Sequence, residues 1–145
     1  MDARLGRILM VEDDPRDVEL TLTALEEYNL ANEVVVTHDG AEALDYLNCR
    51  AEFSTRSSEN PAVILLDLKL PKVDGLEVLT TIKANADLAR LPVVVLTTSA
   101  ADADLARAYG NHANSYLVKP MDLSLFRKLM DDLSLYWLVW NQHPN

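Results

Sequence analysis

The stretch PAVILLDLKLP, residues 61–71, decides the fold. An apolar run from Ala62 to Leu66 leads to a single carboxylate at Asp67, and Pro71 then turns the chain. Such a run between prolines is typical of a strand that is buried on both faces, as in a parallel sheet. Asp67 would then lie at the carboxyl end of this strand, where open α/β sheets hold their ligands.

Four further apolar or β-branched runs predict strands, and the segments between them show helical spacing. The additional strands are expected at residues 7–11, 33–37, 92–97 and 115–118. Helices are expected at residues 15–28, 40–47, 76–85, 101–109 and about 122–141. Strands that alternate with helices predict a five-stranded parallel sheet covered on both sides. With right-handed crossovers, this is a doubly wound, flavodoxin-like α/β domain.

The length and composition suit one domain that spans residues 1–145. We expect the polar segment 48–60 to be a surface loop. The formal charge of −10 opposes binding to nucleic acid or to an anionic membrane. Cys49 is the only cysteine, which excludes a disulfide framework and a thiolate metal cage. No apolar run has the length of a signal segment or a membrane span, so we expect a cytoplasmic protein.

Polar side chains follow the predicted strands at the points where the strands end. They are Glu12 and Asp13, Asp67, Thr97, and Lys119. A parallel sheet brings these ends to one edge, where crowded carboxylates need a divalent cation or an ammonium to relieve their repulsion. Mg²⁺ prefers a few oxygen ligands, and a hydroxyl and an ammonium could bind the oxygens of a docked anion. The set therefore fits the transfer of a phosphoryl group onto a carboxylate.

Each of these residues also has an ordinary structural explanation. An aspartate after a strand is often a turn residue, and acids before Pro15 could cap a helix. Thr97 could cap the following helix, and a Lys-Pro pair is common in turns. These signals are weak one by one. They become specific because they occur in order, at the ends of different strands.

On these residues the sequence resembles the receiver domain of two-component response regulators. The matching motifs are the acidic pair at residues 12–13, Asp67, the loop 70–75, Thr97, and the pair at residues 119–120. Thr97 lies 30 residues after Asp67, and Lys119 follows 22 residues later, as is typical of receivers. The resemblance covers nearly the whole chain.

The resemblance implies that Asp67 accepts a phosphoryl group from a histidine kinase or a phosphotransfer protein. It implies that Asp13, Asp67 and the backbone carbonyl of Lys69 bind Mg²⁺, or another divalent cation such as Mn²⁺ or Ca²⁺. Glu12 stands where an aspartate is more usual and would act through bound water. The side chain of Lys69 would be either a shield for the carboxylates or simply solvated.

The resemblance also assigns the residues that would contact the phosphoryl group. Thr97 and Lys119 would hold its oxygens, together with the backbone of Thr98, a position where a smaller residue is usual. Tyr116 matches the aromatic residue that rotates inward when the threonine moves, so Thr97 and Tyr116 form the implied switch.

The C-terminal segment predicts an interaction surface. Its helical stripe explains Phe126 as a core residue, but the run from residue 135 to residue 140 is apolar on every side. We expect a homodimer through the fourth helix, the fifth strand and the last helix. Its interface residues would be Phe126, Tyr136, Trp137 and Trp140. With the 48–60 insertion, this tail resembles the single-domain regulators that are paired with bacterial and cyanobacterial phytochromes.

Two other functions compete with the phosphoacceptor. A phosphatase of the haloacid dehalogenase type would form an aspartyl phosphate, but it needs an acid where this chain has Lys69. A binding module of receiver fold would work without phosphorylation, and such modules can lose residues of the set described above, which this chain retains. The sequence thus favours a signalling protein over an enzyme that turns over a small substrate.

Overall fold

The computed structural model describes residues 7–26, 34–55, 60–108, 113, 115–120, 122 and 124–132. The strands are β1 (Ile8–Val11), β2 (Val34–Thr37), β3 (Val63–Asp67), β4 (Val93–Thr97) and β5 (Ser115–Val118). The helices are α1 (Pro15–Glu26), α2 (Gly40–Leu47), α3 (Gly75–Ala84) and α4 (Ala100–Ala108), with a short 3-10 helix, η2 (Ala51–Phe53). Residues 124–132 are also helical.

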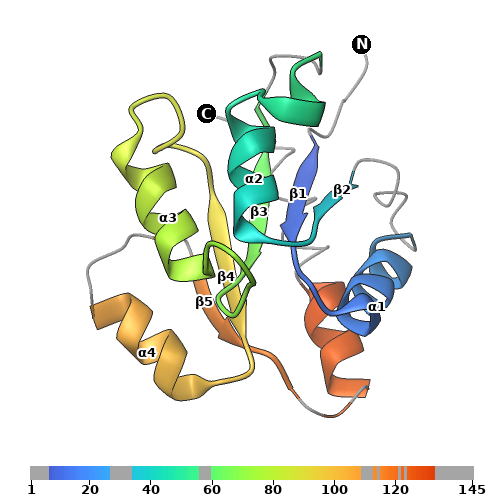
Figure 1. Ribbon diagram of the computed structural model, residues 1–145. Coiled ribbons are helices and arrows are strands. Elements are labelled where there is room, and N and C mark those ends of the chain that lie inside the picture. The colour runs from blue at the N-terminus through green and yellow to red at the C-terminus, as the bar shows by residue number, and fades with distance from the viewer. Residues whose placement is uncertain are drawn as a thin grey trace.

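The strands form one parallel sheet in the order β2-β1-β3-β4-β5, which confirms the predicted doubly wound fold. Every residue of β1, β3 and β4 is buried, because helices cover both faces. The strands run in the same direction, so their carboxyl ends lie at one edge of the sheet (Figure 1). The register places Asp67 opposite Leu96, and Thr97 opposite Val118.

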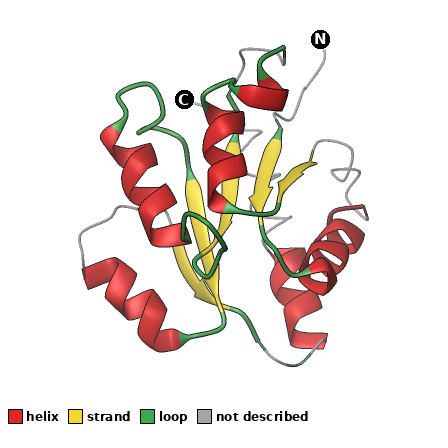
Figure 2. Cartoon of the chain, in the orientation of Figure 1, coloured by secondary structure: helices red, strands yellow, loops and turns green. Residues whose placement is uncertain are grey.

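Helices pack on both faces of the sheet (Figure 2), and an apolar core lies on each face. On one face, α2 and α3 contribute Tyr46, Leu79 and Ile82. On the other face, α1 packs with the helical segment 124–132, whose Phe126 and Met130 are 3% and 2% exposed. The division follows from the alternation of side chains along each strand.

The loop between β3 and α3 is fixed by contacts with two glycines. Gly75 begins α3, and its amide donates to the carbonyl of Leu68 over 2.8 Å. Gly40 begins α2, and its amide lies 3.4 Å from the carbonyl of Pro71. A Cβ atom at either glycine would overlap backbone atoms, at 2.1 Å from the oxygen of Asp67 for Gly75 and 1.8 Å from that of Val73 for Gly40. The loop that follows Asp67 is therefore closely packed.

The structure changes two expectations about the surface. The 48–60 segment was expected to be a loop, but it contains η2, because Phe53 packs edge-on against Tyr46 with ring centroids 5.1 Å apart. Phe126 was expected at a dimer interface, but it is buried in the core and offers no exposed side chain. The other expected interface residues, at positions 136, 137 and 140, lie outside the described part of the chain.

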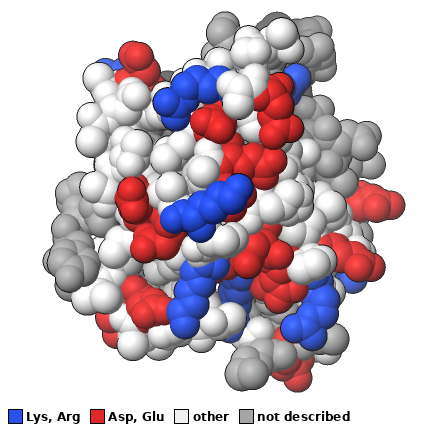
Figure 3. Space-filling model, in the orientation of Figure 1, with Lys and Arg blue, Asp and Glu red and all other residues white. Residues whose placement is uncertain are grey.

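The described surface carries charges of both signs. On the face shown in Figure 3, acidic and basic side chains are interspersed, and the basic ones form no separate patch. Among the described residues, no helix combines the length and the apolar character that a membrane span requires.

Candidate phosphoryl-acceptor site

Three carboxylates meet at the carboxyl edge of the sheet. Glu12 and Asp13 directly follow β1, and Asp67 ends β3, the neighbouring strand. One carboxylate oxygen from each of the three lies within 4.8 Å of the others. Glu12 and Asp67 are buried, whereas Asp13 is exposed. Oxygen ligands at this spacing can hold a hard divalent cation with part of its hydration shell retained.

Lys119 provides the positive charge of this cluster. It directly follows β5, its amide donates to the carbonyl of Thr97 over 2.6 Å, and its side chain is only 4% exposed. The Nζ atom donates to Glu12 Oε1 and, over 2.8 Å, to Asp17 Oδ2. It lies 3.8 Å from Asp67 Oδ2, which is an ion pair but beyond hydrogen-bond distance.

Burial and mutual charge shift the protonation of these groups. Burial raises the pKa of Glu12 from 4.5 to about 7, although the hydrogen bond from Lys119 acts in the opposite direction. Burial also raises the pKa of Asp67, although the charge of Lys119 opposes this. For Lys119, burial lowers the pKa, but the hydrogen bonds to Asp17 and Glu12 outweigh it, so its pKa is raised. The ammonium therefore stays charged at neutral pH.

Thr97 and Tyr116 lie on the neighbouring strands β4 and β5, and Thr98 directly follows β4. Thr97 is fully buried at the end of β4, and its hydroxyl accepts a hydrogen bond from the amide of Ser99 over 3.2 Å. Thr98 is exposed. Tyr116 lies in β5 and packs against the core that α2 and α3 cover, and its hydroxyl accepts from the amide of Ala113. The expected site residues thus come from adjacent strands of one sheet or from the residues that follow the ends of these strands.

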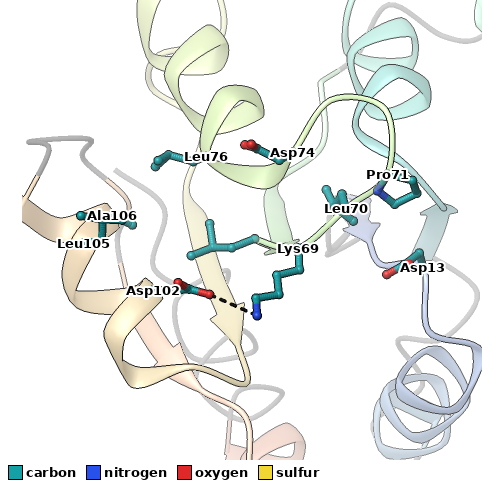
Figure 4. Close-up of a pocket in the computed structure, with 10 residues that line it drawn as sticks. Asp13, Lys69, Leu70, Pro71, Asp74, Leu76, Asp102, Leu105 and Ala106 are labelled. Carbon is teal, nitrogen blue, oxygen red and sulfur yellow. Dashed lines mark ion pairs between the residues drawn. The ribbon is translucent and has the colours of Figure 1, made fainter.

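Lys69 contributes to the site through its backbone. Its amide lies 3.4 Å from Asp67 Oδ1. Its ammonium points toward α4, where it lies 3.6 Å from Asp102 Oδ2 (Figure 4). The two side chains line a pocket of about 550 Å³ between the β3–α3 loop and α4, to which Asp13 also contributes. The side chain of Lys69, for which a shielding role was considered, thus forms an ion pair with Asp102.

Two contacts of the site were not predicted from the sequence motifs. Asp17, in the first turn of α1, binds Lys119, and Asp102, in the first turn of α4, pairs with Lys69. Asp17 follows Asp13 by four residues, but its partner is 102 residues away in the sequence. Only its place in the first turn of a predicted helix was visible as a signal.

The fold and these strand-end residues define a phosphoacceptor of the receiver type. The chain belongs to the response regulator receiver domain family, and residues 8–131 match the model of this family. It is thus a signalling protein of two-component systems rather than an enzyme that turns over a small substrate.

Relatives of the chain fall in different signalling systems. The protein named "Probable methanogenesis regulatory protein FilR2", from Methanothrix harundinacea, is 46% identical over 94% of this chain and 86% of its own length. Response regulator Rcp1 of Synechocystis is 41% identical, and its Mn²⁺-bound structure covers 92% of this chain and 94% of that one with a TM-score of 0.84. The phosphorylated cyanobacterial phytochrome response regulator RcpA is 40% identical, covers 93% and 95%, and also gives a TM-score of 0.84.

The raised pKa of Glu12 predicts that the affinity of this carboxylate cluster for Mg²⁺ depends on pH. Because the pKa of Glu12 is about 7, the carboxylate is mostly protonated one unit below that value and mostly ionised one unit above it. Raising the pH across this interval is expected to increase the affinity by about tenfold, since the cation binds the ionised form. Calorimetric titration with Mg²⁺ at both pH values measures this. In Glu12→Gln the dependence should flatten, and equal native affinities would contradict the raised pKa.

Proposed function

We propose that this protein is a two-component response regulator that accepts a phosphoryl group on Asp67 and signals through protein contacts. The observation that carries this proposal is the convergence of Glu12, Asp13 and Asp67 with the buried ammonium of Lys119 at one edge of the sheet. Receivers need a nucleophilic carboxylate beside a cation site and a fixed positive charge.

A divalent cation, Mg²⁺ for preference, would be held by Asp13, Asp67 and the backbone carbonyl of Lys69. The oxygen chemistry of this set suits Mg²⁺ or Mn²⁺, and the related Rcp1 has been observed with Mn²⁺. When bound, the ion supplies charge neutralisation for the phosphoryl oxygens. The buried carboxylate of Glu12 would contribute through a bound water molecule.

The transfer itself uses the side chain of Asp67. One carboxylate oxygen attacks phosphorus, and the bond from phosphorus to the imidazole nitrogen of a donor phosphohistidine breaks. The electron pair stays on that nitrogen. Lys119 donates to a phosphoryl oxygen, and the hydroxyl of Thr97 and the backbone of Thr98 bind the others. The hydroxyl of Thr97 accepts from the amide of Ser99 and still has its hydrogen to donate, so a phosphoryl group on Asp67 would draw Thr97 inward and let Tyr116 change position.

The partner that supplies the phosphoryl group is a sensor histidine kinase or a phosphotransfer protein, in the cytoplasm. Similarity to RcpA favours a phytochrome-type kinase, including a bacteriophytochrome. Rates of phosphotransfer from candidate kinases, rather than endpoints, would identify it.

Incubation of the native protein with acetyl phosphate and Mg²⁺ tests the phosphoacceptor role. A gain of mass that depends on the cation is expected. No gain in mass from either acetyl phosphate or a set of kinases would contradict the proposal.

The dimer remains part of this proposal. Three large apolar side chains of the described surface are exposed: Leu105 in α4, Val118 in β5 and Leu125 in the helical segment 124–132, at 50%, 44% and 56%. They come from the three elements that the sequence assigns to the interface, and apolar side chains exposed on adjoining elements are typical of a protein interface.

Replacing Leu105 with arginine is expected to weaken self-association by more than about tenfold, because a charge would be buried in an apolar interface. Sedimentation equilibrium over a range of concentrations measures the dissociation constant. Leu20→Arg on α1, a half-buried position outside the three elements, is the control. A native protein that is monomeric at micromolar concentration would contradict the dimer.

A further inference from the structure

Asp17 contacts Lys119 of the site, but the proposed function gives Asp17 no role. It lies in the first turn of α1, and its Oδ2 atom accepts a hydrogen bond of 2.8 Å from Lys119 Nζ. The side chain of Asp17 is 19% exposed, against 4% for Lys119, so the pair is largely shielded from water. Hydrogen bonds between ions are strong in such surroundings.

The donors of Lys119 are divided unequally among the carboxylates. An ammonium has three N–H groups, and two of them are directed to Glu12 and Asp17. Asp67, at 3.8 Å, receives no hydrogen bond from Lys119 in this arrangement. The ammonium is therefore positioned toward β1 and α1, and one donor remains available for a further anion.

Loss of the Asp17 carboxylate would change this division. A buried donor without a partner costs about 1–3 kcal/mol, so the ammonium would move to another acceptor. Among the described residues, Asp67 is the remaining carboxylate in ion-pair distance of Lys119. A direct bond from Lys119 to Asp67 would occupy an oxygen that a cation needs and would place a positive charge next to that cation.

We propose that Asp17 is a positioning residue, which holds the ammonium of Lys119 on the α1 side and thereby keeps Asp67 open to a divalent cation and a phosphoryl group. This inference rests on the proposed function, because it concerns the same site. It assigns a role in the phosphoacceptor to a helix residue that follows the acidic pair.

Titration of the full chain with Mg²⁺ alone tests the inference. Asp17→Asn is expected to lower the affinity by about tenfold, the lower end of the effect of removing a group that supports metal ligands. Asp14→Asn is the matched control, because it removes the same charge nearby, from a carboxylate that pairs with Arg16. Its effect should stay within about twofold, as for a partly exposed surface charge. Equal losses in both variants would overturn the inference.

A second measurement follows Lys119 directly. In the cation-free protein, the ¹⁵N signal of the Lys119 ammonium should shift in Asp17→Asn and remain unchanged in Asp14→Asn. An unchanged signal in Asp17→Asn would overturn the inference. In a Lys119→Met background, Asp17→Asn should lower the Mg²⁺ affinity no more than Asp14→Asn does. A persisting tenfold difference there would show that Asp17 acts without Lys119 and would likewise overturn it.

These outcomes separate the inference from the function on which it rests. If the native protein bound no Mg²⁺ and gained no mass from acetyl phosphate, the proposed function would fail. If the native protein did both and Asp17→Asn matched it in affinity, the positioning role alone would fail.

Discussion

Replacing Asp67 with asparagine is expected to abolish the gain of mass from acetyl phosphate in the presence of Mg²⁺. The carboxylate of Asp67 is the proposed nucleophile at the end of β3, and an amide oxygen is a far poorer one, so the rate should fall by more than about a hundredfold. Asp67 is only 8% exposed, but asparagine has nearly the same shape as aspartate, so the variant should fold. It also removes one of three crowded carboxylates.

Intact-mass spectrometry of the native and variant proteins measures this effect. Asp74→Asn is the control, because Asp74 is an exposed carboxylate at the start of α3 in the loop that follows Asp67. It should gain mass like the native protein. An equal gain in native protein and Asp67→Asn would place the phosphoryl group on another residue and reject the assignment of Asp67.

Replacing Gly75 with alanine is expected to destabilise the fold by about 3 kcal/mol, the upper part of the usual range for inserting a carbon into a packed site. The added Cβ would lie 2.1 Å from the carbonyl oxygen of Asp67 and 2.5 Å from Cα of Leu68. Both are backbone atoms, so a rotamer change cannot relieve the overlap. The end of β3 must shift, and with it the carboxylate of Asp67.

Urea denaturation measures the free energy of unfolding, and Mg²⁺ titration reports on the displaced site. Asp74→Ala is the matched control in the same turn. It loses the cap that accepts from the amide of Glu77 over 2.9 Å, which costs about 1 kcal/mol, but it adds no atom to the packed loop. If Gly75→Ala were as stable as Asp74→Ala, the close packing around Gly75 would not be the constraint inferred here.

The order of the elements and the position of the proposed acceptor, Asp67, could be predicted from the sequence. The run from Ala62 to Leu66 contains no polar residue, and its residues from Val63 onward proved to be fully buried in β3, at the centre of the sheet. Parallel strands of this kind present their carboxyl ends at one edge, so the residues after each run had to converge. The predicted sheet and the meeting of Glu12, Asp13 and Asp67 are confirmed for this reason.

The burial and the contacts of neighbouring side chains could not be predicted in this way. Adjacent residues Glu12 and Asp13 look alike in the sequence, yet one is buried against Lys119 and the other is exposed. Phe126 fitted both a core and an interface, and only the packing of its helix under the sheet decided for the core. Periodicity indicates which face of an element is apolar, but not what covers that face.

Sequence by itself therefore determined a doubly wound domain with an aspartate at the carboxyl end of β3, because both depend on local patterns along the strands. Tertiary structure alone decided that Asp17 binds Lys119 and that Asp102 forms an ion pair with Lys69. These contacts join helices to the sheet edge across long separations in the chain. They depend on distances of a few ångströms between packed elements, which no spacing of residues encodes.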